Sequence, residues 1–384
     1  MRVLGLMSGT SADGVDAVLV ELKGSSARPH WQILARGHVA YPAGLARALI
    51  QLGQGLAQPA ATILELGEAL TLIQAEAARA CDPGSRAQLV GCHGQTVWHR
   101  PPSGSGKRGA SWQLLQGPLL AELLGTPVVY DFRAADLALG GQGAPLVPPT
   151  DLALLGPCEG WRAVLNLGGI ANLTLIPPAG GPDRRRPLLG WDCGPANTLL
   201  DLAVHHFSEG RQSFDNGGQW AQQGTPSETL VQQWLREPYL QQAPPKSTGR
   251  ELFGQHDLQR RLHQMAELGP ADALATLTAF AAAAVVQELE RGPRPLELLV
   301  AGGGARNANL MQQLRRRCYG TMLRPLSELG IGEQDREALA FALLAWWHWR
   351  RYPGNRPSVT GARRAAVLGV CARPSRARGK AQDG

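Results

Sequence analysis

Apolar stretches of two kinds alternate along the chain. Residues 2–7, 87–92 and 162–167 are short apolar runs next to glycine or polar segments, which predicts buried strands. Residues 61–80 instead carry apolar side chains at helical spacing. Because strand and helix signals interleave to the end of the chain, the pattern predicts an α/β fold.

A strand, a glycine-containing loop and a second strand follow one another twice. The first such unit covers residues 2–22 and the second covers residues 162–176. This repetition predicts two similar lobes that face each other. The remaining pattern predicts helices over 118–125, 198–207 and 335–347, strands over 127–132 and 186–192, and a strand, glycine turn and helix over 296–317.

The length of the chain favours two domains. It has 384 residues, more than one compact core usually holds, and residues 139–151 are rich in Gly and Pro, as a hinge would be. We therefore expect an N-terminal lobe over 1–138, completed by 348–371, and a C-terminal lobe over 139–347. The basic segment 372–384 has no apolar partners and reads as a flexible tail.

Composition excludes several classes of protein. Hydrophobic residues make up 44% and charged residues 18%, which is typical of a globular protein, and the net charge is +7. No basic face interleaved with aromatic residues is present, so nucleic acid is not an expected partner. The six cysteines are scattered, which fits a reducing compartment. Residues 273–286 are too short to span a membrane, and no signal peptide precedes the first strand, so we expect a cytoplasmic protein.

The loop "MSGTSADGVD" over residues 7–16 has the composition of a phosphate-binding turn. Gly9 and Gly14 have the spacing of a P-loop, but Val15 and Asp16 stand where Lys and Ser or Thr are required, and a strand follows. The same topology excludes the Rossmann motif. Two interpretations remain open for this loop alone: a hairpin whose N–H groups and hydroxyls surround an anion, or an ordinary hairpin turn. The ATP-binding interpretation takes in Gly9, Thr10, Ser11, Ala12, Asp13, Gly14, Val15 and Asp16.

Two further glycine loops favour the first interpretation. "NLGGIAN" offers Gly168 and Gly169 with the amide of Asn172, and "AGGGARNANL" places Gly302, Gly303 and Gly304 before a helix that follows Asn307. Two phosphate hairpins and such a turn, suited to a sugar or adenine edge, resemble the nucleotide cleft of the actin, hexokinase and heat-shock chaperone superfamily. That resemblance implies a two-lobed, ribonuclease H-like fold that clamps ATP with Mg²⁺ between its lobes.

Longer motifs narrow the resemblance. "HGQT", "DFRAADLALGGQGAPLVP", "WDCGPAN", "PPKSTGRELF" and "EALAFALLA" occur with the loops above in the order typical of the anhydro-N-acetylmuramic acid kinases, and the likeness runs to about residue 368. Departures are small: Ala12 replaces a usual leucine and Cys193 a usual threonine. The resemblance implies a bacterial enzyme of peptidoglycan recycling. It opens the 1,6-anhydro ring of anhydro-N-acetylmuramic acid with water and phosphorylates O6 with ATP, which gives N-acetylmuramic acid 6-phosphate.

Water that attacks an anomeric carbon needs a base, and two carboxylates are candidates. Asp192 lies at the end of a predicted strand, just before Gly194 and Pro195. Taken alone, its position favours the N-cap of a helix that begins at Pro195, but the resemblance matches it to the catalytic base. Glu337 falls in the first turn of a helix that Asp335 would cap, where a surface glutamate is common; the resemblance gives it a role in water activation.

Residues on the sugar side follow from their positions and chemistry together with the resemblance. Gln95 and Thr96 come after a predicted strand, and Arg133 with Asp131 would bind the lactyl carboxylate of the sugar or form an internal ion pair at the hinge. His93 is expected to be structural, and Lys246 and Arg250 are expected to form salt bridges between the lobes. Magnesium has no assigned ligand and would be held through waters. The substrate-binding residues expected are Gln95, Thr96, Asp131, Arg133, Gln142 and Asn197.

Two other functions stay open at this point. One is a kinase of the same fold with a different acceptor, and the other is an ATP-clamping switch. No substrate-binding appendage or filament-forming insert supports a switch, and a homodimer is neither indicated nor excluded.

Overall fold

The computed structural model describes residues 1–9, 12–102 and 106–375. The chain forms two compact units, Met1–Gly156 with Gln334–Gly384 and Pro157–Glu333. These boundaries differ from those of the expected lobes, since 139–156 and 334–347 belong to the first unit. Most of the expected basic tail lies outside the described residues.

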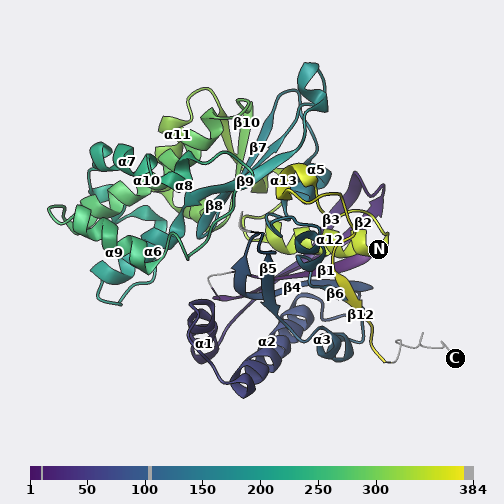
Figure 1. Ribbon diagram of the computed structural model, residues 1–384. Coiled ribbons are helices and arrows are strands. Elements are labelled where there is room, and N and C mark those ends of the chain that lie inside the picture. The colour runs from purple at the N-terminus through teal and green to yellow at the C-terminus, as the bar shows by residue number, and fades with distance from the viewer. Residues whose placement is uncertain (10–11, 103–105, 376–384) are drawn as a thin grey trace. The chain divides into compact units, whose positions relative to one another are not determined.

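The first unit is built on a mixed sheet (Figure 1). Its first three strands form an antiparallel meander, and β4 and β6 continue the sheet in parallel to β1. The strand order is β12-β6-β4-β1-β2-β3, with β5 paired to β4. The strands are β1 (Arg2–Ser8), β2 (Gly14–Gly24), β3 (Pro29–Ala40), β4 (Leu89–Arg100), β5 (Ala110–Leu114), β6 (Val128–Tyr130) and β12 (Val370–Ala372).

Helices cover both faces of this sheet, and glycines set how close one of them comes. Helix α12 (Asp335–Trp349) packs on β1, β2 and β4, opposite α2 (Ala60–Cys81) (Figure 1). A Cβ at Gly5 would lie 1.9 Å from the Ala338 carbonyl oxygen, so only glycine permits this approach. Because side chains alternate along a strand, the neighbouring Leu4 and Leu6 point the other way, into the core with α2. The other helices of this unit are α1 (Ala43–Gly53), α3 (Gly117–Leu124), α4 (Ala134–Ala138), α5 (Pro148–Leu155) and α13 (Pro357–Thr360).

The glycine at position 91 gives a test of this packing. A Cβ there would lie 2.1 Å from the Phe341 carbonyl oxygen, so Gly91→Ala must push α12 away from β4. We expect a loss of about 1–3 kcal/mol in the free energy of unfolding, measured in urea. Gly44→Ala is the matched control, because nothing lies within 4 Å of its added Cβ and helix α1 favours alanine. A Gly91→Ala protein as stable as this control would contradict the close approach.

The second unit repeats the arrangement of the first. Its sheet has the order β11-β10-β7-β8-β9, with an antiparallel β7-β8-β9 meander and two parallel neighbours. The order β9-β8-β7-β10-β11 corresponds strand by strand to β3-β2-β1-β4-β6 of the first unit. This confirms the expected α/β, actin/hexokinase-like fold class and the duplicated unit. The strands are β7 (Arg162–Leu167), β8 (Ile170–Ile176), β9 (Leu189–Pro195), β10 (Glu297–Ala301) and β11 (Met322–Pro325).

A long apolar helix, α10 (Pro270–Glu290), runs through the core of the second unit. Among the described residues it alone has the length and hydropathy of a membrane span, but 89% of its most apolar window is buried inside the unit. We therefore assign it to the core. The other helices of this unit are α6 (Asn197–Phe207), α7 (Glu228–Leu235), α8 (Pro238–Gln241), α9 (Gln255–Gln264) and α11 (Ala308–Arg317).

Three expected boundaries were wrong. Strand β9 continues through Asp192 to Pro195 and α6 begins at Asn197, so Asp192 is not a helix cap and Pro195 is not a first helical residue. Strand β4 does not end before the "HGQT" motif but includes it. Asp335 is the first residue of α12, whose N-cap is Gln334.

Candidate functional site

Three side chains, those of Ser8, Tyr41 and Gln95, form hydrogen bonds at the start of the loop after β1. The Ser8 hydroxyl lies 2.5 Å from Gln95 Oε1 and 2.6 Å from the Tyr41 hydroxyl, and Gln95 Nε2 donates to the Gly9 carbonyl oxygen at 3.0 Å. Ala12 N–H also donates to Gly9 O, at 3.1 Å. Burial raises the pKa of Tyr41, which keeps its phenol protonated. These bonds fix the ends of the loop; Thr10 and Ser11, two of its expected phosphate-binding residues, lie outside the described residues.

Gln95, which was expected to bind the sugar, is buried beside this loop. Its amide bonds to the loop on both sides, at Oε1 and at Nε2. Glycine at position 14 also has a local cause, because a Cβ there would lie 2.4 Å from the Val39 carbonyl oxygen on β3. Tyr41, which follows β3, was missed because no motif marks it. Ser8 lies within the motif, but its hydroxyl was expected to face an anion and not Gln95 and Tyr41.

Asp16 begins a group of charged residues in the first unit. Its Oδ1 lies 2.8 Å from His38 Nδ1. Burial raises the pKa of Asp16, the His38 hydrogen bond opposes this, and the carboxylates of Asp13 and Asp335 add to the rise. A cation beside this loop would therefore be stabilised electrostatically.

The first turn of α12 places three charged side chains next to one another. Asp335 pairs with Arg36, and Arg336 binds Asp151 on α5 with two hydrogen bonds of 3.0 and 2.5 Å. Glu337 is partly buried; burial raises its pKa, while the guanidinium groups of Arg336 and Arg133 lower it. The ion pairs of the two preceding residues thus fix the turn that carries Glu337.

His93 is buried against the same part of the sheet. Its Nδ1 donates to Gly94 O at 2.8 Å, and its Nε2 accepts from Arg133 Nη2 at 2.9 Å. Burial and then the Arg133 charge lower the pKa of His93 well below its usual value, so the ring is neutral at physiological pH. Arg133 also donates to Gly143 O at 2.7 Å, which ties β4 to the glycine-rich segment.

Thr96, Asp131 and Gln142 are the other residues of the first unit that were expected to bind the sugar. Thr96 accepts a hydrogen bond from Gln113 at 3.1 Å, and the backbone N–H of Gln142 donates to Thr360 O at 2.8 Å. Asp131 adopts a left-handed backbone conformation (φ 54°), which is uncommon outside glycine. Burial raises its pKa.

Asp136 is a buried structural centre that the sequence analysis missed. One carboxylate oxygen accepts from Gly143 N–H at 2.8 Å, and the other accepts from Asn355 Nδ2 at 2.6 Å and Thr360 Oγ1 at 2.7 Å. Asp136 therefore fixes the glycine-rich segment against the C-terminal motif "VTGA". Its only signal was its place within "DFRAADLALGGQG".

In the second unit, three polar side chains form a row across adjacent strands. Asn166 on β7 lies opposite Asn172 on β8, and Asn172 lies opposite Asp192 on β9. Directly opposite residues of an antiparallel pair project from the same face. A β-bulge at this point makes Cys193 the extra residue of β9. The row brings together two residues expected from the sequence and one, Asn166, that lies in the motif "NLGGIAN".

Asp192 is held by backbone groups of a distant segment. Its Oδ2 accepts from Thr248 N–H at 3.0 Å, and its own N–H donates to Lys246 O at 3.2 Å. Its carbonyl oxygen accepts from the Tyr239 hydroxyl at 2.9 Å. Lys246 pairs with Glu288 at 2.9 Å inside the second unit, so the expected salt bridge between lobes was wrong for this residue. The charge of Arg250 acts on Asp201 of α6, a carboxyl whose pKa burial raises to about 7.

The two glycine loops of this unit contact each other. The carbonyl oxygens of Gly168 and Gly169 accept hydrogen bonds from the first residues of α6, and Asn197 Nδ2 donates to Leu167 O at 2.9 Å. A Cβ at Gly304 would lie 2.7 Å from the Leu167 Cβ. Close packing of the turn over Gly302–Gly304 on the β7–β8 hairpin thus requires glycine. Asn307 caps α11, because its Oδ1 accepts from Leu310 N–H at 3.0 Å.

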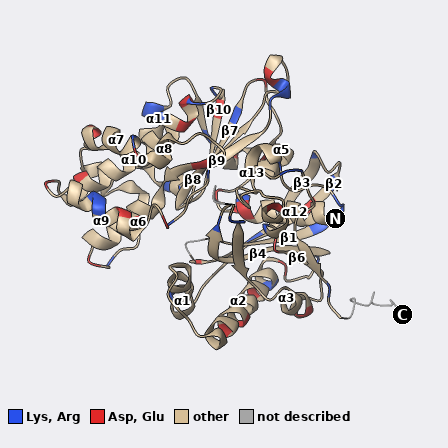
Figure 2. Ribbon diagram, viewed as in Figure 1, with Lys and Arg blue, Asp and Glu red and all other residues tan. Residues whose placement is uncertain are grey.

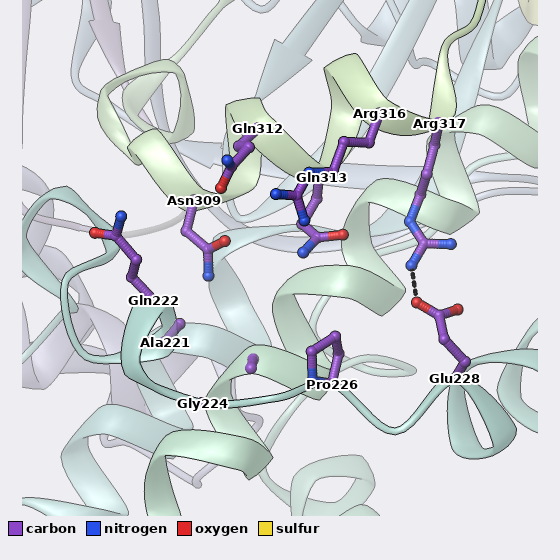
Figure 3. A pocket seen from close by; sticks show the side chains of 11 residues that line it. Ala221, Gln222, Gly224, Pro226, Glu228, Asn309, Gln312, Gln313, Arg316 and Arg317 are labelled. Atoms are coloured by element: carbon purple, nitrogen blue, oxygen red, sulfur yellow. Dashed lines mark hydrogen bonds and ion pairs between the residues drawn. The ribbon is translucent and has the colours of Figure 1, made fainter.

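A separate cavity of about 550 Å³ lies between the segment 221–228 and α11 (Figure 3). Amide side chains of α11 and the guanidinium of Arg316 surround it, and the Arg317–Glu228 ion pair borders it (Figure 3). Figure 2 shows the basic character of α11, which ends in three arginines. None of the residues expected to bind ATP or sugar lines this cavity, so we assign it no part in the reaction.

Comparison with known proteins gives the family. The family model described as anhydro-N-acetylmuramic acid kinase matches residues 1–374. A protein of that name from Synechococcus sp. (strain WH7803) is 60% identical over 387 residues, which cover 98% of this chain and 100% of the relative. One from Prochlorococcus marinus (strain MIT 9211) is 52% identical over 380 residues, with 98% and 100% covered.

A solved structure, component A of the (R)-2-hydroxyglutaryl-CoA dehydratase of Acidaminococcus fermentans, covers 90% of this chain and 98% of its own. At 12% identity and a TM-score of 0.44, that likeness is too distant to inform function. The match to the family model and to full-length relatives is sufficient without it. The chain belongs to the anhydro-N-acetylmuramic acid kinase family.

Proposed function

We propose that this kinase opens the 1,6-anhydro ring of its sugar with a water molecule that Asp192 deprotonates, and phosphorylates the released O6 with ATP. Water adds to the anomeric carbon as the bond from that carbon to O6 breaks. O6 then takes the γ-phosphoryl group, and ADP leaves. The products are N-acetylmuramic acid 6-phosphate and ADP, which places the enzyme in peptidoglycan recycling and amino-sugar catabolism.

The position of Asp192 is the observation that supports this proposal best. Its carboxylate lies in a polar row with Asn166 and Asn172, and Thr248 N–H fixes its Oδ2 at 3.0 Å. An oriented carboxylate on a strand is suited to accept a proton from water. We further propose that Glu337, whose pKa burial raises, assists water activation from the first unit.

Nucleotide binding is proposed for the three glycine loops. The loop that begins at Gly9 and the pair Gly168 and Gly169 would receive the phosphates, and the turn over Gly302–Gly304 would contact adenosine. Phosphoryl transfer needs alignment and charge neutralisation more than covalent help, and backbone N–H groups supply both. The residues proposed to contact the sugar are Gln95, Thr96, Asp131, Arg133, Gln142 and Asn197.

Magnesium fits this site as an ion carried mainly by ATP. Among the described residues no three His, Cys, Asp or Glu side chains come together to hold a metal. Mg²⁺ usually keeps several waters and needs only one or two carboxylates beside the phosphates. Asp13 and Asp16 are the carboxylates of the segment that follows Gly9. Burial raises the pKa of Asp16, and a cation bound beside it would lower that pKa again. Bound there, the ion would neutralise phosphate charge.

We place the enzyme in the bacterial cytoplasm, where ATP and its sugar would both be present, and a homodimer stays an open expectation. The proposal is tested by incubation with ATP and anhydro-N-acetylmuramic acid, followed by mass spectrometry. We expect a product that exceeds the sugar by one phosphoryl group and one water. A phosphorylated product without the added water would contradict ring opening. Phosphorylation of a plain hexose, with none of the anhydro sugar, would favour a kinase with another acceptor.

A further inference from the structure

Beneath Asp192 lies a buried ion pair that no step of the reaction uses. Lys246 Nζ lies 2.9 Å from Glu288 Oε1, and the two side chains are 2% and 0% exposed. Glu288 also accepts from Trp191 Nε1 at 2.8 Å and from Arg291 Nη1 at 2.7 Å. Trp191 is the residue before Asp192 on β9, so the ion pair is hydrogen-bonded to the immediate neighbour of the proposed base.

The same lysine anchors the segment that binds Asp192. Its Nζ donates to Tyr239 O at 3.2 Å and lies 4.8 Å from the centre of the Tyr239 ring. Tyr239 in turn donates its hydroxyl to Asp192 O, while Lys246 O and Thr248 N–H bind the backbone and carboxylate of Asp192. Strand β9 is the edge of its sheet, so these contacts replace the neighbouring strand that Asp192 lacks on that side.

Stability alone does not account for a buried pair at this place. Removing two charges from water costs about as much as their attraction returns, and apolar residues of similar volume often serve as well. What an apolar pair would not provide is a hydrogen-bonded anchor for residues 246–248, from Lys246 Nζ to Tyr239 O and to Glu288. That anchor holds Thr248 N–H on the Asp192 carboxylate, which favours the ionised, oriented form of a base.

We propose that Lys246 and Glu288 are positioning residues for Asp192. They hold the segment 246–248 in place, so that Thr248 N–H binds Oδ2 of Asp192. This bond keeps the carboxylate in an orientation suited to proton transfer. This inference rests on the proposed role of Asp192 as the base, which it extends to the residues that act through it.

The test compares Lys246→Met with the native enzyme at saturating ATP and sugar. We expect kcat to fall at least about tenfold, since misorientation of a catalytic group by a fraction of an ångström is costly, while both KM values stay within about twofold. A disordered Thr248 N–H no longer stabilises the ionised carboxylate of Asp192, so the acidic limb of the kcat profile should move to higher pH.

Two further variants keep the outcome interpretable. Arg261→Met is the matched control, because Arg261 is also fully buried and pairs with Asp257 at 2.9 Å and with Glu237 at 2.8 Å. Its ion pairs go to these two carboxylates and not to Asp192 or the segment 246–248. It should lose stability but keep the native pH profile. If Lys246→Met fails to fold, Lys246→Met with Glu288→Gln removes both charges and should fold with the same fall in kcat.

Each result has a distinct meaning. A folded Lys246→Met or double variant with native kcat and pH profile would overturn the positioning role. A shift of the pH profile in Arg261→Met as large as in Lys246→Met would overturn it too, because any buried charge would then suffice. Native turnover in Asp192→Asn would instead remove the proposed base, and the positioning role would fall with it.

Discussion

Replacing Asp192 by asparagine should abolish turnover while ATP still binds. The amide has the shape of the carboxylate, and its oxygen can still accept from Thr248 N–H, now 3.0 Å from Oδ2. It cannot take a proton from water, and general-base catalysis usually contributes about 10²- to 10⁴-fold. We expect kcat to fall by that factor, measured by ADP release, with the Kd for ATP within about twofold by calorimetry.

A surface carboxylate of the same unit supplies the comparison. The Glu209 side chain is 84% exposed and pairs loosely with Arg211, so Glu209→Gln should retain native kcat and ATP affinity. Asp192→Asn with kcat close to that of this control would exclude Asp192 as the base. Loss of ATP binding along with turnover would show a general defect of the unit instead of a missing proton acceptor.

The sequence predicted those hairpins and helices whose signals lie within one short segment of the chain. The hairpins β1–β2 and β7–β8 were evident because apolar runs lie on either side of short glycine loops. Helix α2 was evident from the helical spacing of its apolar residues. The end of β9 was not, because Gly194 and Pro195 look like a helix start. Pairing of β9 with β8 through a bulge extends the strand instead, and this pairing is not visible in the sequence around Asp192.

Residues of the site could be predicted by type, but their partners could not. Asp192 and Glu337 were identified through motifs that resemble a family. The Thr248 N–H that binds Asp192 is 56 residues away, and the Asp151 that binds Arg336 is 185 residues away. Contacts over such separations depend on tertiary packing. The same reason led Lys246 to be read as a bridge between lobes when its partner Glu288 lies in its own unit.

Substitution of Asp151 by alanine should destabilise the first unit strongly. Asp151 and Arg336 are each 2% exposed, and their two hydrogen bonds of 3.0 and 2.5 Å form a bidentate pair. Truncation leaves a buried guanidinium without its main partner, and breaking such a pair usually costs about 3–5 kcal/mol. We expect a loss of that size in the free energy of unfolding, followed by the fluorescence of the buried tryptophans in urea.

The exposed pair of Lys23 and Glu21 is the control for this loss. Lys23 Nζ lies 2.6 Å from Glu21 Oε2, but the lysine side chain is 64% exposed. Lys23→Ala should therefore lower the free energy of unfolding by less than about 1 kcal/mol. Equal losses in the two variants would show that Asp151 acts through the fold of α5 and not through its charge.

The double variant Asp151→Leu with Arg336→Met separates stability from catalysis. Apolar residues of similar volume should restore most of the lost stability, because a buried pair gains little over good packing. Activity should not return with it. Arg336 lies next to Glu337 and lowers the pKa that burial raises, and its effect is larger than that of the Asp151 carboxylate, which raises this pKa. Without both charges, Glu337 is therefore ionised less readily at a given pH. The pH at which kcat is half-maximal on the acidic side should therefore rise in the double variant. If stability and the native pH profile return together, Arg336 serves the fold alone and Glu337 does not depend on its charge.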